Sequence, residues 1–152
     1  MKVLRVQGNF FKDLREKSAK ETIAIDFDGY AIGGLSVGES KDVFADILSY
    51  TTPLLPENKP RYLMGVGTPE DIFTGVSAGI DMFDCVLPTR LARHGHAFTK
   101  YGKINLRNAK YKEDLSPVEE GCDCENHERE RSSYRSALFV LQIPEAVKRM
   151  KN

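Results

Sequence analysis

Hydrophobic and polar positions follow two different periods along the first two thirds of the chain. Short runs rich in β-branched and aromatic residues alternate with stretches that have helical spacing, and glycines separate the two. The runs predict four strands, at Val3–Val6, Phe27–Ile32, Arg61–Met64 and Met82–Leu87. Strand, glycine loop and helix, repeated about four times, are typical of parallel α/β structure.

Three helices are predicted between these strands. The first has Phe11, Leu14 and Ser18 on one face, and the second begins after Ser40, a residue type that caps helices. The apolar stripe of the second helix consists of Val43, Phe44, Ile47 and Leu48. The third helix begins after Thr68, with Pro69 at its first position and two acidic residues in its first turn, which suits the positive end of the helix dipole.

The rhythm changes after the fourth strand. The runs 96–99 and 103–106 flank Tyr101-Gly102 and predict a β-hairpin, whereas the chain beyond Lys112 is acidic and weakly patterned. Four βα units are half of a TIM barrel, which has eight strands. We therefore expect a partial TIM barrel with a hairpin insertion over residues 1–112 and a separate segment over 113–152. An open α/β sheet is the alternative on periodicity alone.

Composition limits the class of protein. The chain has 152 residues, of which 41% are hydrophobic and 29% charged, as in an ordinary globular protein. Its longest apolar runs fall well short of the roughly 18 residues of a membrane span, so no membrane partner is expected. The first nine residues hold no secretory signal, and an odd count of three cysteines favours a reducing compartment. The sequence predicts a cytoplasmic protein.

Charge is uneven along the chain although the formal net charge is zero. Seven basic residues and no acid lie between Arg90 and Lys112, and acidic residues follow. A local basic stretch can bind phosphate in a neutral protein because exposed charges are screened over about 8–10 Å. A solvated loop is the alternative interpretation.

Each predicted strand ends in polar or glycine-rich residues, and such ends form the active site of parallel α/β proteins. Glycines follow the second and third strands, and Gln7 follows the first, where its carboxamide offers a planar heterocycle both a donor and an acceptor. Asp84 lies within the apolar fourth run. A carboxylate in that setting is either part of a structural ion pair or catalytic.

Several longer motifs are more specific. The segments 29–39, 60–71, 79–90 and 102–109 resemble, in this order, the motifs of the tRNA-guanine transglycosylases, also called queuine tRNA-ribosyltransferases, in their bacterial form. The resemblance covers about residues 5–135 and concerns only the C-terminal half of such enzymes. It implies the C-terminal half of a TIM (β/α)8 barrel, followed by a β-hairpin and, over residues 113–152, by a remnant zinc-binding segment and a divergent tail.

The resemblance implies a reaction in queuosine biosynthesis, in which the wobble guanine of a tRNA is exchanged for a 7-deazaguanine. Asp84 would attack the anomeric carbon of the ribose and release guanine. The incoming base would then attack the covalent ribosyl-aspartate, as in a retaining glycosidase.

The resemblance also implies two sets of contacts. Base-binding residues would be Gln7, Gly34, Leu35, Val37, Tyr62 and Met64. Val37 matches the bacterial form of its loop, which favours the precursor base 7-aminomethyl-7-deazaguanine. Residues that contact tRNA would be Gly65, Val66, Gly67, Thr68, Pro69, Glu70, Asp71, Thr89, Arg90, Leu91, Ala92 and Arg93.

Zinc is the cofactor that the resemblance brings with it. The family binds zinc with the pattern Cys-x-Cys-x-x-Cys and a histidine about one helix later. Cys122 and Cys124 match, but His127 occupies the third position, and the fourth ligand would fall just past Asn152. Histidine is a competent ligand, yet a structural zinc site uses four. We expect weak zinc binding or none.

Two further departures qualify the expected activity. The family's general base and another base-recognising aspartate belong to its N-terminal half, and no counterpart precedes Val3; Asn9 also stands where a glycine is expected. We therefore expect this chain alone to be inactive, and to self-associate or to require a missing N-terminal half. The alternatives are a non-catalytic tRNA-binding accessory module and an unrelated α/β domain.

Overall fold

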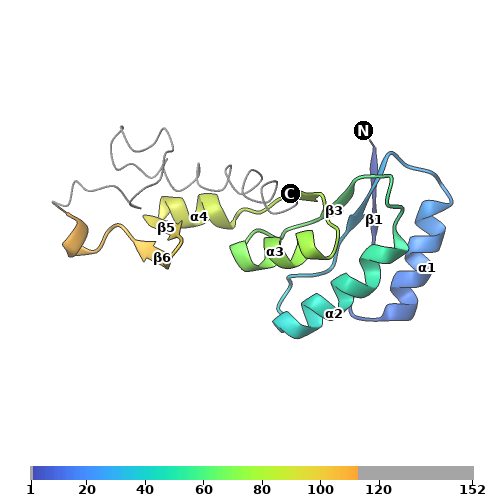
Figure 1. Cartoon of the computed structure of the whole chain (residues 1–152), viewed down its shortest axis with the longest axis horizontal. Helices are drawn as coiled ribbons and strands as arrows, with labels where there is room; N and C mark the ends of the chain where they lie inside the picture. The colour runs from blue at the N-terminus through green and yellow to red at the C-terminus, as the bar shows by residue number, and fades with distance from the viewer. Residues whose placement is uncertain (1, 113–152) are drawn as a thin grey trace. The chain divides into compact units, whose positions relative to one another are not determined.

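The structure of the chain is a computed structural model that describes residues 2–112. The chain divides after Cys85 into two compact units, Met1–Cys85 and Val86–Asn152, and each unit is described by itself. Figure 1 shows the helices and strands of both units with the labels used below.

A four-stranded parallel sheet forms the centre of the first unit. Its strands are β1 (Val3–Val6), β2 (Gly29–Ile32), β3 (Arg61–Leu63) and β4 (Met82–Phe83). They lie in chain order, each pairing in parallel with the next, so β1 and β4 are the edge strands. The expectation of an α/β fold with a parallel sheet is confirmed.

Three helices connect the strands and lie along one face of the sheet (Figure 1): α1 (Lys12–Ile23), α2 (Lys41–Thr51), which continues into the 3-10 turn η1 (Thr52–Leu54), and α3 (Pro69–Ser77). Both predicted caps are confirmed. Ser40 Oγ accepts a hydrogen bond from the N–H of Val43 at 3.3 Å, and Thr68 Oγ1 accepts one from the N–H of Asp71 at 3.3 Å. These bonds satisfy N–H groups that the first turn of a helix leaves unpaired.

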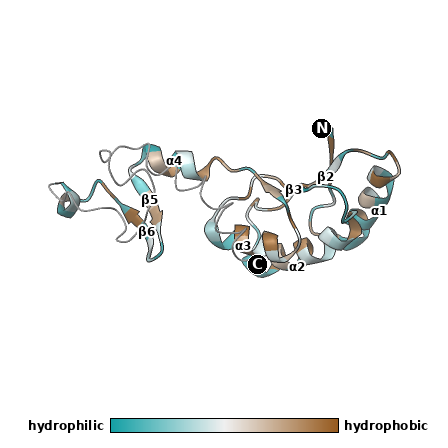
Figure 2. Cartoon of the chain, turned by 45° about the horizontal axis from the view of Figure 1, so that its top comes forward, coloured by the Kyte–Doolittle hydropathy of each residue, from teal (hydrophilic) through white to brown (hydrophobic). Residues whose placement is uncertain are grey.

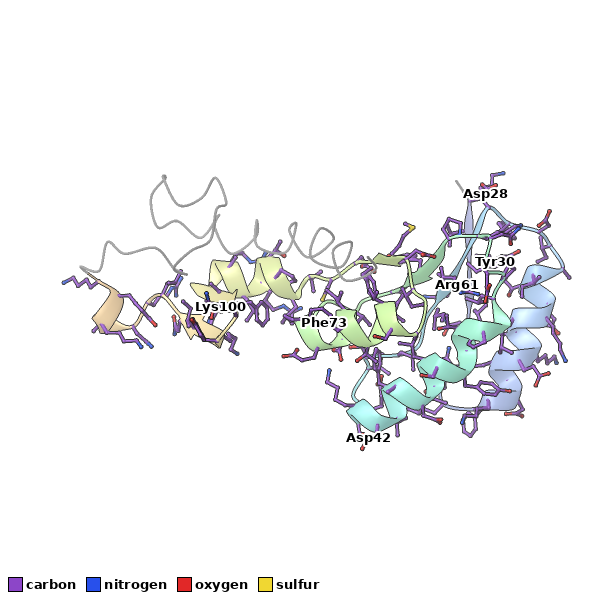
Figure 3. The ribbon with its side chains drawn as sticks, in the orientation of Figure 1. Asp28, Tyr30, Asp42, Arg61, Phe73 and Lys100 are labelled. Carbon is purple, nitrogen blue, oxygen red and sulfur yellow. The ribbon has the colours of Figure 1, made fainter. Side chains whose placement is uncertain are left out.

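Strand register decides which side chains meet the helices. Val6, Ile32, Leu63 and Phe83 are partners in adjacent strands and pack in one core cluster. The cluster includes Phe44, Ile47 and Leu48 of α2, and Figure 2 shows apolar and polar sides on both α2 and α3. Figure 3 shows two further buried side chains of this unit, Tyr30 and Arg61.

The buried face of α1 differs from the prediction. Phe11 and Leu14 are exposed, at 60% and 47%, whereas Arg15, Ala19 and Thr22 face the interior. The face predicted from apolar spacing was therefore wrong. Arg15 occupies the inward position instead, and its guanidinium donates hydrogen bonds to backbone carbonyls. Val43 of the predicted α2 stripe is likewise 39% exposed.

The fourth strand is shorter than predicted. β4 ends at Phe83, and a helix that was not predicted, α4 (Leu87–Arg93), begins four residues later with Pro88 in its first turn. Asp84 therefore does not lie within an apolar strand. It directly follows the strand and is exposed.

The second unit contains the predicted hairpin. Strands β5 (His96–Thr99) and β6 (Gly102–Asn105) pair in antiparallel fashion, followed by the 3-10 turn η2 (Ala109–Tyr111). The turn is one residue earlier than predicted, at Lys100-Tyr101, and Gly102 opens β6 with a φ of 114° that favours glycine.

Three further expectations concern membrane spans, metal ligands and the C-terminal segment. Within residues 2–112, no helix is long and apolar enough to cross a membrane, and no group of three or more His, Cys, Asp or Glu could hold a metal ion. The proposed ligands Cys122, Cys124 and His127 lie outside the described residues. So does the segment 113–152, and the predicted boundary at residue 112 therefore stays a prediction.

Candidate functional site

The candidate site lies one residue beyond the core row of the sheet. Gln7, Gly33, Met64 and Asp84 directly follow the row of Val6, Ile32, Leu63 and Phe83. The ladder continues into this second row, since Gly33 N–H donates to Val6 O and Met64 N–H to Ile32 O, each at 3.1 Å. Successive strand residues point to opposite faces.

This alternation gives the sheet a helix-free face, defined here as the face of the first unit opposite α1, α2 and α3. Arg5, Ala31, Tyr62 and Met82 are register partners on it, and the row that begins with Gln7 continues it at the carboxyl ends of the strands. The structure thus brings together four predicted site residues, namely Gln7, Tyr62, Met64 and Asp84, with Gly34 and Gly65 in the adjoining loops.

Asp84 is held by two donors from the neighbouring strand and its loop. The hydroxyl of Tyr62 donates to Asp84 Oδ1 at 2.6 Å, and the N–H of Gly65 donates to the same oxygen at 2.8 Å. Gly65 has a φ of 74°, a conformation that glycine adopts without steric cost and that turns its N–H toward the carboxylate. An exposed carboxylate is thereby fixed in one orientation.

The same contacts move the pKa values of both side chains. The hydrogen bond from Tyr62, followed by that from Gly65, lowers the pKa of the Asp84 carboxyl. The hydrogen bond to Asp84 raises the pKa of Tyr62 to about 12. Asp84 is therefore ionised and Tyr62 protonated at neutral pH, so the phenol is a fixed donor to a charged carboxylate.

Gln7 faces a cation on its own strand. When the carboxamide is oriented to satisfy both of its ends, Oε1 accepts from Arg5 Nε and from Arg5 Nη2, both at 2.8 Å. The stem of Arg5 lies over Gly33, where a Cβ would stand 2.4 Å from Arg5 Cδ. Gly33 is therefore the residue that allows Arg5 to reach Gln7.

Arg15 of α1 supports the same loops from the helix side. Its side chain has no exposed surface. Nε donates to Asn9 O at 2.6 Å, and Nη2 donates to Gly33 O at 3.0 Å and Gly34 O at 3.5 Å. Burial lowers the pKa of Arg15, and the charge of Glu39 partly opposes this shift. A buried guanidinium bonded to three carbonyls holds the loops after β1 and β2 together.

The loop after β2 carries the other predicted base-binding residues. Leu35 is buried at 4% exposure, and Val37 is exposed at 71%. Glu39 folds back to accept hydrogen bonds from the N–H of Ser36 and from that of Val37, the latter at 2.9 Å. The backbone at 35–37 is therefore set by contacts within the loop, with Val37 at its exposed tip.

Residues 65–71, predicted to contact tRNA, form the loop after β3 and the start of α3. Asp71 is buried at 4% exposure; it accepts from Thr68 Oγ1 at 2.7 Å and pairs with Lys41 of α2. The side chains of Val66 and Asp71 are thus structural, and Gly67 is buried against Cys85. Any surface contact here falls to Gly65, Thr68, Pro69 and Glu70.

Residues 89–93, also predicted to contact tRNA, belong to α4 of the second unit. Thr89, Arg90 and Arg93 are exposed, Leu91 is half-buried, and Ala92 is buried at 4% exposure. Arg107 from the end of the hairpin donates through Nη2 to Arg93 O at 3.0 Å. This contact joins the basic residues of helix and hairpin on one unit.

Sequence reasoning missed Arg5 and Arg15. Both left a signal. Arg5 stands two residues before Gln7 and so on the same face of a strand. Arg15, Ala19 and Thr22 have the i, i+4, i+7 spacing of an inward helix face. The pattern was missed because its first residue is charged.

The geometry can be set beside known proteins. The family model for queuine tRNA-ribosyltransferase matches residues 3–139 of the chain. Several curated relatives carry that same name. The one from Dictyoglomus turgidum is 57% identical over 135 residues, covering 89% of this chain and 35% of the relative.

The relatives from Pelotomaculum thermopropionicum and Bacillus subtilis are 63% and 60% identical over 119 residues, which is 78% of this chain and 32% and 31% of the relatives. The chain spans about a third of the length of the curated relatives it matches. It belongs to the queuine tRNA-ribosyltransferase family.

Proposed function

We propose that this chain supplies the nucleophile of a tRNA-guanine transglycosylase and one wall of its base-binding site. The observation that carries the proposal is the arrangement of Asp84, an exposed carboxylate at the carboxyl end of a parallel strand, held by Tyr62 and the N–H of Gly65. Groups that perform chemistry occupy this end of the strands in parallel α/β enzymes.

The fold that we propose is the C-terminal half of a TIM barrel. Four strands paired in chain order, with helices on one face only, are what half of such a barrel requires. Both edge strands, β1 and β4, then present unpaired backbone groups that another part of a barrel would cover. We therefore expect the chain by itself to self-associate, or to require an N-terminal half that provides the remaining strands.

The reaction that we propose begins with attack by Asp84 on the ribose. Because both hydrogen bonds end on Oδ1, Oδ2 is the oxygen that forms the bond to C1′. The bond from C1′ to N9 of guanine breaks, and the base leaves with its electron pair and takes up a proton. The 7-deazaguanine then attacks C1′ through N9, loses a proton and restores the carboxylate.

The remaining roles follow from position. Gln7 and the backbone at Gly34-Leu35 would bind the edge of the base, with Tyr62 and Met64 beside its faces and Val37 beside the 7-substituent. Arg90 and Arg93 would bind tRNA phosphate, which positions the anticodon without reading it. A target base also has to leave its stack to be reached.

Zinc remains a proposal limited by its ligands. Cys122, Cys124 and His127 offer three donors, while a closed structural site uses four. We infer that zinc binds weakly and is removed by a chelator, and a metal assay after dialysis against a chelator checks this. Zinc retained at one ion per chain would contradict it.

Reconstitution tests the proposed function. The full chain is mixed with the segment of the Bacillus subtilis relative that precedes the matched region, and incorporation of labelled guanine into tRNA is measured. We expect exchange from the mixture and none from either part alone. The mixture with Asp84→Asn should be inactive, whereas the matched Asp81→Asn, which removes a carboxylate three residues earlier, should retain activity.

The accessory-module alternative predicts a different result. The chain would then bind tRNA through its basic residues, yet no mixture would exchange guanine. Binding measured against salt concentration, for the chain and for an Arg90→Ala, Arg93→Ala variant, separates tRNA affinity from catalysis. Binding without exchange in any mixture would overturn the transglycosylase proposal and leave the module.

A further inference from the structure

Two arginines that the proposed mechanism does not use converge on its base-binding residues. Arg5 reaches Gln7 from the helix-free face of the sheet, and Arg15 reaches the backbone of Gly33 and Gly34 from the helix side. We propose that Arg5 and Arg15 are positioning residues that fix the Gln7 carboxamide so that its N–H2 group, a hydrogen-bond donor, faces the base. The inference rests on the proposed function of the site.

Arg5 determines which end of the carboxamide is free. A glutamine side chain presents a donor and an acceptor that exchange places when the amide turns over. Two N–H groups of one guanidinium bind Oε1 at 2.8 Å each, and turning the amide over would set its N–H2 against those donors. The acceptor end is therefore occupied by Arg5, and only the donor end remains for a ligand.

Arg15 fixes the backbone against which this donor end lies. The free end of the Gln7 carboxamide is 3.1 Å from the position of a Cβ on Gly34, whose φ is 70°. Arg15 bonds the carbonyls of both Gly33 and Gly34 and also that of Asn9, two residues after Gln7. One buried side chain thus sets the distance between the loop that carries Gln7 and the loop that carries Gly34-Leu35.

Arg15 is a buried charge with no exposed surface, and burying a charge destabilises a fold unless the group is hydrogen-bonded. Nε and Nη2 of Arg15 donate to three carbonyls, whereas its buried Nη1 has no hydrogen-bond partner among the residues that the structure describes. Arg61, the second buried arginine (Figure 3), differs in place: its Nη2 donates to Leu55 O, before β3 begins. Arg61 therefore provides a matched control, buried but at the opposite ends of the strands.

The first test needs no catalysis. Side-chain ¹⁵N relaxation of Gln7 is measured in the full chain, in Arg5→Met and in the control Lys2→Met, which removes one exposed charge near the start of the same strand. We expect an order parameter near that of rigid backbone, about 0.85, in the wild type and Lys2→Met, falling below about 0.6 in Arg5→Met. A Gln7 side chain equally ordered in Arg5→Met would overturn the inference.

The second test uses two bases in the reconstituted mixture. 2,6-Diaminopurine carries an amino donor where guanine carries the 6-oxygen acceptor, and its N1 lacks the hydrogen of guanine. A fixed N–H2 of Gln7 can donate to the guanine oxygen and is repelled by the amino group, whereas the difference at N1 is common to wild type and variant. We expect Arg5→Met to lose about tenfold of the preference for guanine, because a freed amide can turn over. Arg15→Lys should raise the KM for guanine more than it lowers kcat, and Arg61→Lys should leave preference and KM unchanged.

The two tests distinguish a failure of the positioning inference from a failure of the proposed function. An unchanged preference in Arg5→Met, or an effect of Arg61→Lys equal to that of Arg15→Lys, would contradict positioning and favour a general loss of stability. If wild-type mixtures exchange no guanine at all, the proposed function fails, and the order parameter of Gln7 still decides whether Arg5 holds the carboxamide.

Discussion

The two faces of the sheet use the same four strands for different purposes. On the helix-covered face, Leu63 and its register partners are enclosed by apolar side chains of the helices. One residue further along, on the helix-free face, Gln7, Gly33, Met64 and Asp84 form the next row, and its polar members are bound by Arg5, Tyr62 and a backbone N–H.

The difference shows how stability and chemistry are divided within a strand. Burial of apolar area stabilises the covered row, whereas the polar side chains of the next row gain orientation from charged or phenolic partners. Because side chains alternate, a step of one residue separates the two functions. Substitutions on the two faces should therefore have different consequences, the first in folding and the second in protonation and binding.

The largest effect is expected on the covered face. Leu63→Ala removes a side chain with no exposed surface and should lower the free energy of unfolding by about 2–5 kcal/mol, because lost burial adds to the cavity left behind. Met82→Ala, on the helix-free face of the neighbouring strand, is the comparison and should cost far less, because the Met82 side chain is already 37% exposed. Urea unfolding followed by circular dichroism measures both, and equal costs would remove the distinction between the faces.

Self-association should depend on apolar side chains that the helices leave outside. Leu14 is 47% exposed on α1, next to the edge strand β1, and exposed apolar groups beside an open edge favour association. Sedimentation at several concentrations should show oligomers that Leu14→Glu weakens severalfold. Ser49→Glu adds the same charge at an exposed polar position of α2 and should not. A chain that stays monomeric throughout contradicts the expectation.

Protonation on the helix-free face should respond to single substitutions. The pKa of Tyr62 is raised to about 12 by its hydrogen bond to Asp84, so Asp84→Asn should return it toward the ordinary value of about 10. Ultraviolet difference titration of the two proteins isolates this one tyrosine among six. Asp81→Asn is the control, since its carboxylate binds the N–H of Arg61 instead. Superimposable curves for wild type and Asp84→Asn would show that the bond is absent.

A smaller effect is expected in acid. The folded-state pKa of Asp84 is depressed, so its contribution to stability is present above the unfolded value of about 3.9 and is lost as pH falls through the lower folded value. Tyr62→Phe removes the main hydrogen-bond donor to Asp84. The free energy of unfolding of this variant should therefore depend slightly less steeply on pH below about 4. Urea midpoints measured from pH 2 to about 5 test this, and an unchanged slope would mean that Tyr62 does not stabilise the carboxylate.

The sequence predicted the first three strands and the two caps well because those signals are local: β-rich runs, Ser40 and Thr68 before helical spacing. It misplaced the end of the fourth strand. The run from Met82 to Leu87 is apolar except for Asp84, but only Met82 and Phe83 pair with residues of β3. It also missed the inward face of α1, where long-range bonds from Arg15 to carbonyls of other loops outweigh apolar spacing. Contacts between loops cannot be read from spacing along one segment.

The candidate site was predictable in its members and not in its connections. Strand ends and motif resemblance indicated Gln7, Gly34 and Asp84, and the register places these residues at one end of the sheet. That Tyr62 binds Asp84, rather than only lining the base, depends on neighbouring strands being in register. Arg5 and Arg15 left only weak signals in the sequence, because the contact of Arg5 with Gln7 passes over Gly33 of the neighbouring strand and Arg15 bonds carbonyls of two other loops.

The most direct test of the central claim is a search for the covalent intermediate. The chain reconstituted with the N-terminal segment of the Bacillus subtilis relative is incubated with labelled tRNA, quenched with acid and separated under denaturing conditions. We predict a tRNA adduct attached to Asp84 by mass spectrometry, absent in Asp84→Asn although tRNA binding through Arg90 and Arg93 persists. An adduct that survives in Asp84→Asn would assign the nucleophile to another residue and contradict the mechanism.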